Sequence, residues 1–296
     1  MRMGIITPVV TLNPRARGTW EEAAGLPELT AIAEAADRLG YHHLTCSEHV
    51  AVPGEAAERR GSRYWDPLAT LGFLAARTTR IRLATHVLVL GYHHPLAIAK
   101  RYGTLDVVSG GRLILGVGVG SLEEEFTLLG APFADRGERG DDALRALRAA
   151  LGTREPEYHG THYDFEGLVV DPPATRTDVQ LWIGGRSARS LRRAVELGDG
   201  WAPFGVTVEQ IEEWMAEARA TDAWAARTRP LEIVLYPDPV VDPVDDPAGT
   251  AERVERYVAA GATVLNLRFR TRSLAHCLEQ LEAMADRPEF SPAPST

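Results

Sequence analysis

The sequence has few cysteines and no long apolar run. Its two cysteines, Cys46 and Cys277, stand outside any Cys-x-x-Cys or Cys/His ligand spacing, so the sequence indicates neither a disulfide framework nor a structural zinc site. The N-terminal apolar stretch turns polar at Asn13, too early for a signal peptide. No window reaches the roughly 18 apolar residues of a membrane span. We therefore expect a cytoplasmic protein.

Basic residues are also too few for a nucleic-acid-binding or membrane-surface protein. The chain has 32 Lys and Arg against 41 Asp and Glu, a formal net charge of −9, whereas binding to phosphate backbones needs a basic face. Lys100 is the only lysine, and this preference for arginine, with abundant alanine and glycine, is typical of a high-GC coding sequence. Hydrophobic residues make up 45% of the chain, which is typical of a folded globular protein.

Short β-rich apolar runs alternate with segments of helical period along the whole chain. Pro67 and Pro95 stand where helices should begin, and Gly40, Gly110 and Gly198 stand where helices should end. Eight strands are predicted, at Met3–Thr7, His43–Ser47, Ile81–Leu88, Leu113–Val117, Gln180–Ile183, Gly200–Ala202, Leu231–Tyr236 and Thr263–Leu267. This alternation predicts an α/β protein, a single (β/α)8 TIM-like barrel over residues 1–296.

One βα unit is longer than a barrel requires. About 60 residues, roughly 121–180, follow the fourth strand, and we expect there an insertion with a helix near Asp141–Leu151 and a small hairpin within Tyr158–Pro173. The polar segment Val50–Asp66 is a second long βα loop and a candidate lid. The proline-rich C-terminal tail, about 287–296, is expected to be flexible.

In such a barrel the functional groups lie at the carboxyl ends of the strands. The second strand ends in Glu48 and His49, a carboxylate beside an imidazole, which can carry charge and a proton in one place. The alternative is that Glu48 pairs with an arginine for stability and His49 faces the loop. The residues alone leave both readings open.

The third strand and the turn after it carry three histidines: His86, His93 and His94. A metal-hydrolase barrel usually has His-x-His at its first strand, where this chain has Ile5, Ile6 and Thr7 instead. We therefore expect no metal, and His93 and His94 are expected to shape the turn before the helix at Pro95.

The fourth and fifth strands end in glycine. Gly116, Gly118 and Gly120 alternate along one face of the fourth strand, so that a flat ring could lie against the backbone there, unless they only relieve crowding at the barrel mouth. Residues 184–187, Gly-Gly-Arg-Ser, join the fifth strand to a helix and leave backbone N–H groups open to an anion. This segment predicts a phosphate cradle; the alternative is a serine N-cap after a tight turn.

Together these motifs resemble the luciferase-like monooxygenase family, which includes the deazaflavin-dependent oxidoreductases. The resemblance covers roughly residues 3 to 270. It is carried by Gly40-Tyr41, Ser47-Glu48-His49, Tyr64-Trp65-Asp66-Pro67, Arg80 to Thr85 with Val87, His94-Pro95 with Ala99-Lys100, Ser109 to Gly120, Glu124-Glu125-Phe126, Arg136-Gly137, Ile183-Gly184-Gly185 and Gly198-Asp199-Gly200-Trp201.

The resemblance implies a TIM-like barrel that binds coenzyme F420 or, as the alternative, FMN at its mouth. It implies that His49 lies near the reactive edge of the ring and that Glu48 hydrogen-bonds the cofactor. It further implies a non-proline cis peptide bond, whose counterpart here is His86–Val87. The implied phosphate ligands are Gly184, Gly185, Arg186 and Ser187, and the implied ring contacts are Thr85, His86, Val87, Val89 and Gly118.

The sequence departs from some deazaflavin dehydrogenases at Ser121, where these enzymes have a carboxylic acid that donates a proton. Glu124, about one helical turn further on, is the substitute we consider for this catalytic role; the alternative is an acidic first turn, Glu123 to Glu125, that faces water. Arg59, Arg60 and Arg63 on the candidate lid are placed to meet the anionic tail of F420, unless they are solvated.

These expectations describe an oxidoreductase that transfers a hydride between coenzyme F420 and a small, largely apolar organic substrate. The first alternative is an FMN-dependent monooxygenase that uses O2 and reduced flavin from a partner reductase. The second is a non-catalytic ligand-binding barrel. Relatives of this kind are frequently dimers, so a homodimer is also expected.

Overall fold

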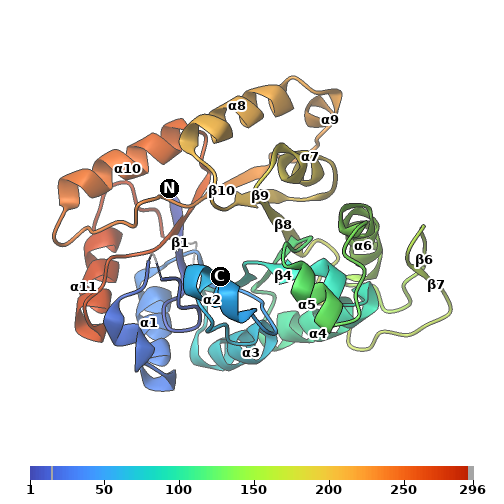
Figure 1. The fold of residues 1–296 in the computed structure, drawn as a ribbon, viewed down its shortest axis with the longest axis horizontal. Helices are drawn as coiled ribbons and strands as arrows, with labels where there is room; N and C mark the ends of the chain where they lie inside the picture. The colour runs from blue at the N-terminus through green and yellow to red at the C-terminus, as the bar shows by residue number, and fades with distance from the viewer. Residues whose placement is uncertain (15, 293–296) are drawn as a thin grey trace.

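Eight parallel strand positions form a closed barrel in the computed structural model, which describes residues 1–14 and 16–292. Neighbouring strands follow the order β3, β2, β1, β11, β10, β9, β8, β5, β4, and a β3–β5 pairing closes the ring (Figure 1). The strands are β1 (Arg2–Ile6), β2 (His43–Cys46), β3 (Arg82–Thr85), β4 (Leu88–Val89), β5 (Leu113–Gly118), β8 (Gln180–Gly185), β9 (Gly200–Pro203), β10 (Glu232–Leu235) and β11 (Val264–Leu267). The predicted TIM-like barrel is confirmed.

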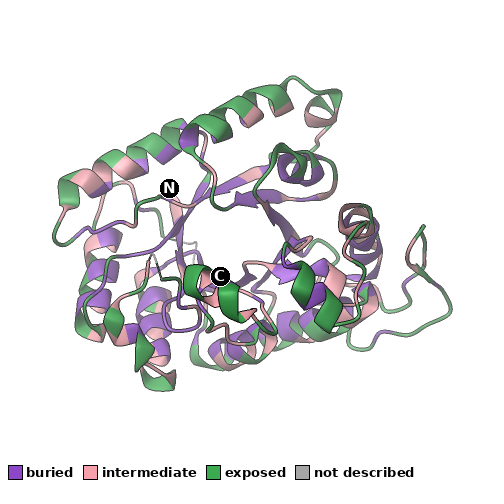
Figure 2. Ribbon diagram, in the orientation of Figure 1, coloured by how far each residue is buried: buried purple, intermediate pink, exposed green. Residues whose placement is uncertain are grey.

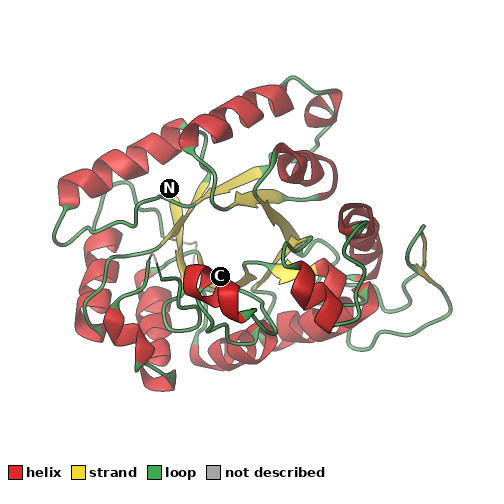
Figure 3. Ribbon diagram, viewed as in Figure 1, coloured by secondary structure: helices red, strands yellow, loops and turns green. Residues whose placement is uncertain are grey.

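Helices surround the strands and turn their apolar faces inward (Figures 2 and 3). They are α1 (Leu26–Leu39), α2 (Gly54–Arg60), α3 (Pro67–Arg77), α4 (Pro95–Val108), α5 (Glu123–Leu128), α6 (Arg136–Ala150), α7 (Ala188–Leu197), α8 (Val208–Arg219), α9 (Asp222–Ala225), α10 (Pro247–Ala259) and α11 (Leu274–Ala285), with short 3-10 turns η1 (Thr19–Glu22) and η2 (Leu90–Tyr92). Proline starts α3 and α4 where the sequence predicts it, and Gly40 ends α1 in the left-handed conformation, φ 83°.

The insertion after the fourth strand is built around a helix that belongs to the barrel itself. Helix α6 packs against α4 and α7, so it takes the place of the fourth barrel helix. The additional chain is therefore α5 before α6 and the hairpin after it, in which β6 (Tyr158–His159) pairs antiparallel with β7 (Asp164–Phe165). The predicted small hairpin is thereby confirmed, and Figure 1 shows it projecting from the side of the molecule.

The apolar core has two parts. The larger part fills the layer between strands and helices. The smaller part fills the barrel interior with Ala84, Ile114, Trp182, Ala202, Val234 and Val264. Beside it lies His43, fully buried with its ring 4.9 Å from that of Trp182. Burial lowers the pKa of His43 well below its ordinary value, so its imidazole is neutral inside the barrel.

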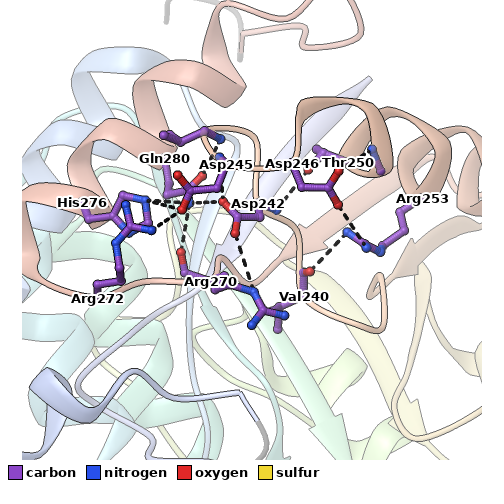
Figure 4. A network of polar contacts seen from close by, with 12 residues as sticks. Val240, Asp242, Asp245, Asp246, Thr250, Arg253, Arg270, Arg272, His276 and Gln280 are labelled. Atoms are coloured by element: carbon purple, nitrogen blue, oxygen red, sulfur yellow. Dashed lines mark hydrogen bonds and ion pairs between the residues drawn. The ribbon is translucent and has the colours of Figure 1, made fainter.

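The loops after β10 and β11 are tied together by a polar network (Figure 4). Asp242 accepts a hydrogen bond from the amide nitrogen of Gln280, 2.6 Å, and lies 3.6 Å from Arg270. Asp245 pairs with Arg272. Asp242, Asp245 and His276 lie close enough to surround a cation, but arginines already neutralise both carboxylates, so the network serves to join the two loops.

The chain termini meet on one side of the barrel. Phe290 packs against the ring of Tyr41 at 5.0 Å, and the Ser291 N–H donates to the Met1 carbonyl, 2.9 Å. The first part of the tail predicted as flexible thus contacts the barrel, while 293–296 lie outside the described residues. Among the described helices, none is both long and apolar enough to span a membrane.

Replacing Gly4 by alanine should destabilise the fold, because a β carbon at Gly4 would lie 2.1 Å from the His43 ring. His43 is fully buried and has no room to move away, so we expect a loss of about 1–3 kcal/mol, as for other overpacked cores. Urea denaturation measures the change.

The matched control is Gly72→Ala in α3, where nothing lies within 4 Å of the added carbon. This variant should gain up to about 1 kcal/mol, since alanine favours the helix more than glycine does. Equal effects of the two substitutions would contradict the packing argument at Gly4.

Candidate functional site

Glu48, just after β2, binds the backbone of β4, which forms the end of the third barrel strand. One carboxylate oxygen accepts the Val89 N–H, 2.7 Å, and the other faces Nε2 of His93, also 2.7 Å. Both contacts involve the end of the third barrel strand and the η2 turn. The ion pair with an arginine that the sequence left open for Glu48 is absent from the described residues; its partner is a histidine. His93 shapes this turn, as expected.

His49 forms a pair with a carboxylate that lies 76 residues further along the chain. Its Nδ1 is 2.7 Å from Oε2 of Glu125, whose side chain is fully buried. The same carboxylate accepts the Val50 N–H at 2.5 Å and the Tyr92 hydroxyl at 2.7 Å. The His49 ring also packs edge-on against Tyr64, with 4.5 Å between ring centroids.

The surroundings of Glu125 fix its ionisation state. Burial acts to raise its pKa, but the hydrogen bonds from His49 and Tyr92 outweigh burial, and the pKa of Glu125 is lowered. Burial and the bond to Glu125 raise the pKa of Tyr92, which therefore donates. Because an ionised carboxylate only accepts, Nδ1 of His49 must donate its proton, and Nε2 is left to exchange a proton. This is the geometry of a histidine oriented for acid–base chemistry.

Val87, in the third strand position, packs against the ends of β5 and β8. A β carbon at Gly118 would lie 2.8 Å from the Val87 side chain, and one at Gly184 would lie 2.5 Å from it. At Gly116 the added carbon would lie 2.0 Å from the Thr85 carbonyl oxygen. The alternating glycines therefore make room for the third strand position, whichever ligand lies above it.

The third barrel strand is interrupted at the predicted place. The His86–Val87 peptide bond is cis, as the family resemblance implied. Ser47 donates to the His86 carbonyl at 2.6 Å, and Thr85 donates to the Gly116 carbonyl at 2.6 Å. Burial lowers the pKa of His86 to about 4, so its imidazole is neutral near pH 7, unlike that of a proton carrier matched to neutral pH.

The phosphate-cradle segment, residues 184–187, has the geometry of an anion site. Gly185 adopts φ +152°, and a β carbon there would lie 2.5 Å from Ser190, so a side chain would close the turn. Ser187 is the N-cap of α7, yet its side chain accepts no capping hydrogen bond. Arg186 and Ser187 are both exposed. The cradle thus fits a phosphate group, which would meet the N-terminus of a ten-residue helix.

The structure decides between the two readings of the acidic turn and places Ser121 and Arg63. Glu124 is exposed, whereas its neighbour Glu125 faces His49. Ser121 is exposed and lies 3.4 Å from the Arg60 guanidinium on the candidate lid. Arg63 donates to the carbonyls of Glu21 and Glu22, which anchor this loop to the barrel.

Glu125 is the candidate site residue that sequence reasoning missed. In α5 it shares one helix face with Leu122 and Phe126, both buried, at the i, i+3, i+4 spacing. This periodicity was the available signal. The partner, His49, could not be read from it, because the contact depends on how α5 folds over the end of β2.

The chain belongs to the luciferase-like monooxygenase family, whose model matches residues 1–293. It is 30% identical to an uncharacterized protein of Mycobacterium tuberculosis over 214 residues, 68% of this chain and 74% of the relative. It is also 30% identical to the F420-dependent glucose-6-phosphate dehydrogenase of Microbacterium testaceum over 184 residues, 61% of this chain and 53% of that enzyme. The family places the protein among oxidoreductases and monooxygenases.

Solved structures share the fold at low identity. The monooxygenase RslO1 of Streptomyces bottropensis aligns with a TM-score of 0.72 at 21% identity, covering 97% of this chain and 98% of that one. The coenzyme F420-dependent tetrahydromethanopterin reductase of Methanopyrus kandleri gives 0.69 at 14%, covering 88% and 94%. The oxygenating constituent of 3,6-diketocamphane monooxygenase of Pseudomonas putida, in complex with FMN, gives 0.71 at 16%, covering 99% of each chain.

The Glu125→Gln variant should be destabilised at neutral pH. The glutamine amide keeps one acceptor oxygen, but its NH2 group faces groups that donate to Glu125, such as the Val50 N–H and the Tyr92 hydroxyl. We therefore expect the free energy of unfolding to fall by about 1–3 kcal/mol at pH 7. Because the pKa of Glu125 is lowered in the folded state, its ionised form stabilises the fold fully above about pH 4.5 and loses this effect as the pH falls through the folded-state pKa. Urea denaturation at pH 7 and pH 3.5 measures this effect. The difference between the midpoints of the variant and the wild type should be smaller at pH 3.5.

Glu124→Gln is the matched control, since it changes the neighbouring, exposed carboxylate of the same helix. We expect a change within about 0.5 kcal/mol at either pH. If the stability difference between Glu125→Gln and the wild type is the same at both pH values, the ionised carboxylate of Glu125 does not stabilise this site.

Proposed function

We propose that this protein is an oxidoreductase that transfers a hydride between coenzyme F420 and a small, largely apolar organic substrate at the barrel mouth. The observation that carries the proposal is the buried Glu125 beside His49, which orients an imidazole for proton exchange within the same end of the barrel as an anion cradle. The 30% identity to an F420-dependent dehydrogenase supports the choice of cofactor.

The cradle residues Gly184, Gly185, Arg186 and Ser187 would hold the cofactor phosphate, through backbone N–H groups and the field of α7. The ring would rest near Val87, with Thr85, His86, Val89 and Gly118 around it. When bound, the cofactor supplies the hydride chemistry. The fit is supported by the exposed Ser187, whose side chain makes no capping hydrogen bond, and by Gly185, where a side chain would meet Ser190 and close the turn.

His49 would move the proton that accompanies hydride transfer. Glu125 holds Nδ1–H, so Nε2 exchanges the proton with a substrate atom, as in other carboxylate-oriented histidines. Glu125 itself is a positioning residue, because it acts through His49. Glu48 would act mainly by fixing the Val89 backbone beside the ring, and its expected hydrogen bond to the cofactor would be an additional one. The exposure of Glu124 favours the reading in which it faces water.

A second candidate function is an FMN-dependent monooxygenase that uses O2 and a partner flavin reductase. The likeness to two monooxygenase structures, one of them in complex with FMN, favours this reading. Both reactions would use the same cradle and the same histidine, so the identity of the bound cofactor separates them. The distinction matters because only the monooxygenase consumes oxygen.

Titration of the purified, cofactor-free protein with F420 and separately with FMN, followed by ligand fluorescence, tests the cofactor. We expect tight binding of F420 and at least tenfold weaker binding of FMN. Gly185→Val should weaken F420 binding at least tenfold, because the valine would meet Ser190 and close the cradle. Arg192→Ala, an exposed position one turn into α7, is the control and should bind more tightly than Gly185→Val.

Tight binding of FMN alone would contradict the use of F420 and favour the FMN-dependent monooxygenase. Binding of neither ligand would favour the non-catalytic barrel. Unchanged affinity of Gly185→Val would contradict the phosphate cradle itself.

The His49→Ala variant should bind F420 as the wild type does but turn over about 10²–10⁴-fold more slowly, the usual contribution of a positioned acid–base group. The assay follows oxidation of reduced F420 with a panel of small, largely apolar acceptors. His159→Ala, which removes an exposed histidine on the β6–β7 hairpin, is the control and should retain full activity. Turnover by His49→Ala at the wild-type rate would exclude His49 as the proton carrier.

A further inference from the structure

The end of the barrel opposite the candidate site contains a cavity lined by arginines. Its lining residues lie at or just before the N-terminal ends of parallel strands: Arg82 begins β3, Arg176 precedes β8, and Arg227 precedes β10. Since the strands run parallel, this floor cavity faces away from the mouth. Its volume is about 220 Å³, several times the roughly 30 Å³ that one water occupies in the liquid and below the roughly 300–1,000 Å³ of sites for drug-sized ligands.

The three acids of the floor cavity are already paired. Glu232 binds Arg2 at 2.7 Å and accepts the indole N–H of Trp182 at 2.8 Å. Asp199 binds Arg148 at 2.8 Å and accepts the Leu181 N–H at 2.9 Å. Neither carboxylate is therefore free to neutralise a further arginine.

The third acid, Asp178, is half exposed and serves two weak contacts. It lies 3.4 Å from Arg229 and 3.8 Å from Nε of Arg176. Exposed pairs of this kind contribute little to stability, because water and salt screen them. The floor cavity thus has four arginines against three acids, two of which are held by arginines from outside it.

Two of the four arginines, Arg82 and Arg176, have no carboxylate of the described residues within hydrogen-bond distance. Arg82 donates to the side-chain oxygen of Gln180 and forms no ion pair with the described residues. Burial and the charge of Arg176 lower the pKa of Arg82 to about 10, although Glu232 and Asp106 act in the opposite direction. In Arg176, Nε and Nη2 are buried and have no hydrogen-bond partner in the described part of the chain.

Arg227 adds a further charge, and it forms no ion pair with the described residues. Its guanidinium donates to the carbonyls of Val195 at 2.5 Å and Gly198 at 3.1 Å, at the end of α7. These bonds satisfy donors but leave the positive charge in place. In a chain of net charge −9, four arginines around one cavity are a local exception.

Buried guanidinium nitrogens without partners are costly, and a planar guanidinium matches two oxygens of one carboxylate or phosphate. We propose that the floor cavity binds a small multivalent oxyanion, a phosphate or a dicarboxylate, between Arg82, Arg176 and Arg227. This site is separate from the cradle at the mouth and does not depend on the proposed function. An anion that binds the folded chain alone stabilises it as its concentration rises.

Thermal unfolding of the full chain tests this site in sodium phosphate, sodium succinate and sodium chloride at matched ionic strength and pH 7.5. We expect a saturable rise of the melting temperature in phosphate or succinate relative to chloride. The anion with the lower half-saturation concentration identifies the ligand class. Equal melting temperatures in all three salts, or a rise that does not saturate, would overturn the proposal.

Arg176→Gln should raise the half-saturation concentration at least tenfold, because it removes the charge with unpartnered nitrogens. Arg154→Gln is the matched control: it removes the same charge from an exposed arginine that pairs with Glu155. Gly185→Val alters the cradle and leaves the residues of the floor cavity unchanged. Its melting temperature should therefore still rise with the anion concentration.

If the melting temperature of Arg176→Gln rises with the anion as that of the wild type does, the floor site is overturned. If only Gly185→Val loses this rise, the anion binds at the mouth and the proposal is likewise overturned. If Arg154→Gln also loses the anion-dependent rise of the melting temperature, the effect is one of general charge, and the proposal is overturned. Arg229→Gln is a second variant for the case that Arg176→Gln does not fold. It should raise the half-saturation concentration as well, since Arg229 also lines the cavity.

Discussion

The end of the third barrel strand must fit between its neighbours, and the geometry of the mouth depends on this fit. The third barrel strand breaks off after Thr85 and resumes at Leu88, and between them the Val87 side chain lies against the ends of β5 and β8. Gly118 and Gly184 leave the space that Val87 occupies. Hydrogen bonds from Ser47 to the segment and from the Val89 N–H to Glu48 hold it from the other side. Three neighbouring strands are thus fixed by one packing constraint.

Two buried carboxylates at the mouth have different tasks. Glu48 binds backbone and His93, and so stabilises the end of the third strand. Glu125 binds the His49 imidazole, the Tyr92 hydroxyl and the backbone after His49, so it orients a group that can exchange protons. The second carboxylate comes from α5, part of the additional chain after β5, so the long insertion supplies the buried partner of His49.

The two ends of the barrel differ in charge. The mouth combines carboxylates, histidines and an open helix N-terminus, which suits a phosphate-bearing redox cofactor and a proton carrier. The floor gathers arginines around a cavity whose acids are already paired. In barrels of this class the mouth carries catalysis and the floor carries stability. A ligand at the floor would accordingly act on the stability of the fold.

The sequence by itself determined the barrel and the positions of the strand-end glycines, because strand and helix periods and glycine positions are local properties of the chain. The family and the position of the cis bond came from the resemblance of its motifs to the luciferase-like family. The sequence also placed His49 at a strand end. Only the tertiary structure decided that Glu125, and not Glu124, reaches His49, since one residue along a helix turns a side chain by about 100°. It likewise decided that Gly118 and Gly184 accommodate Val87, and that Arg82, Arg176 and Arg227 meet at one floor. These contacts join residues far apart in the chain, and their distances follow only from how the strands close.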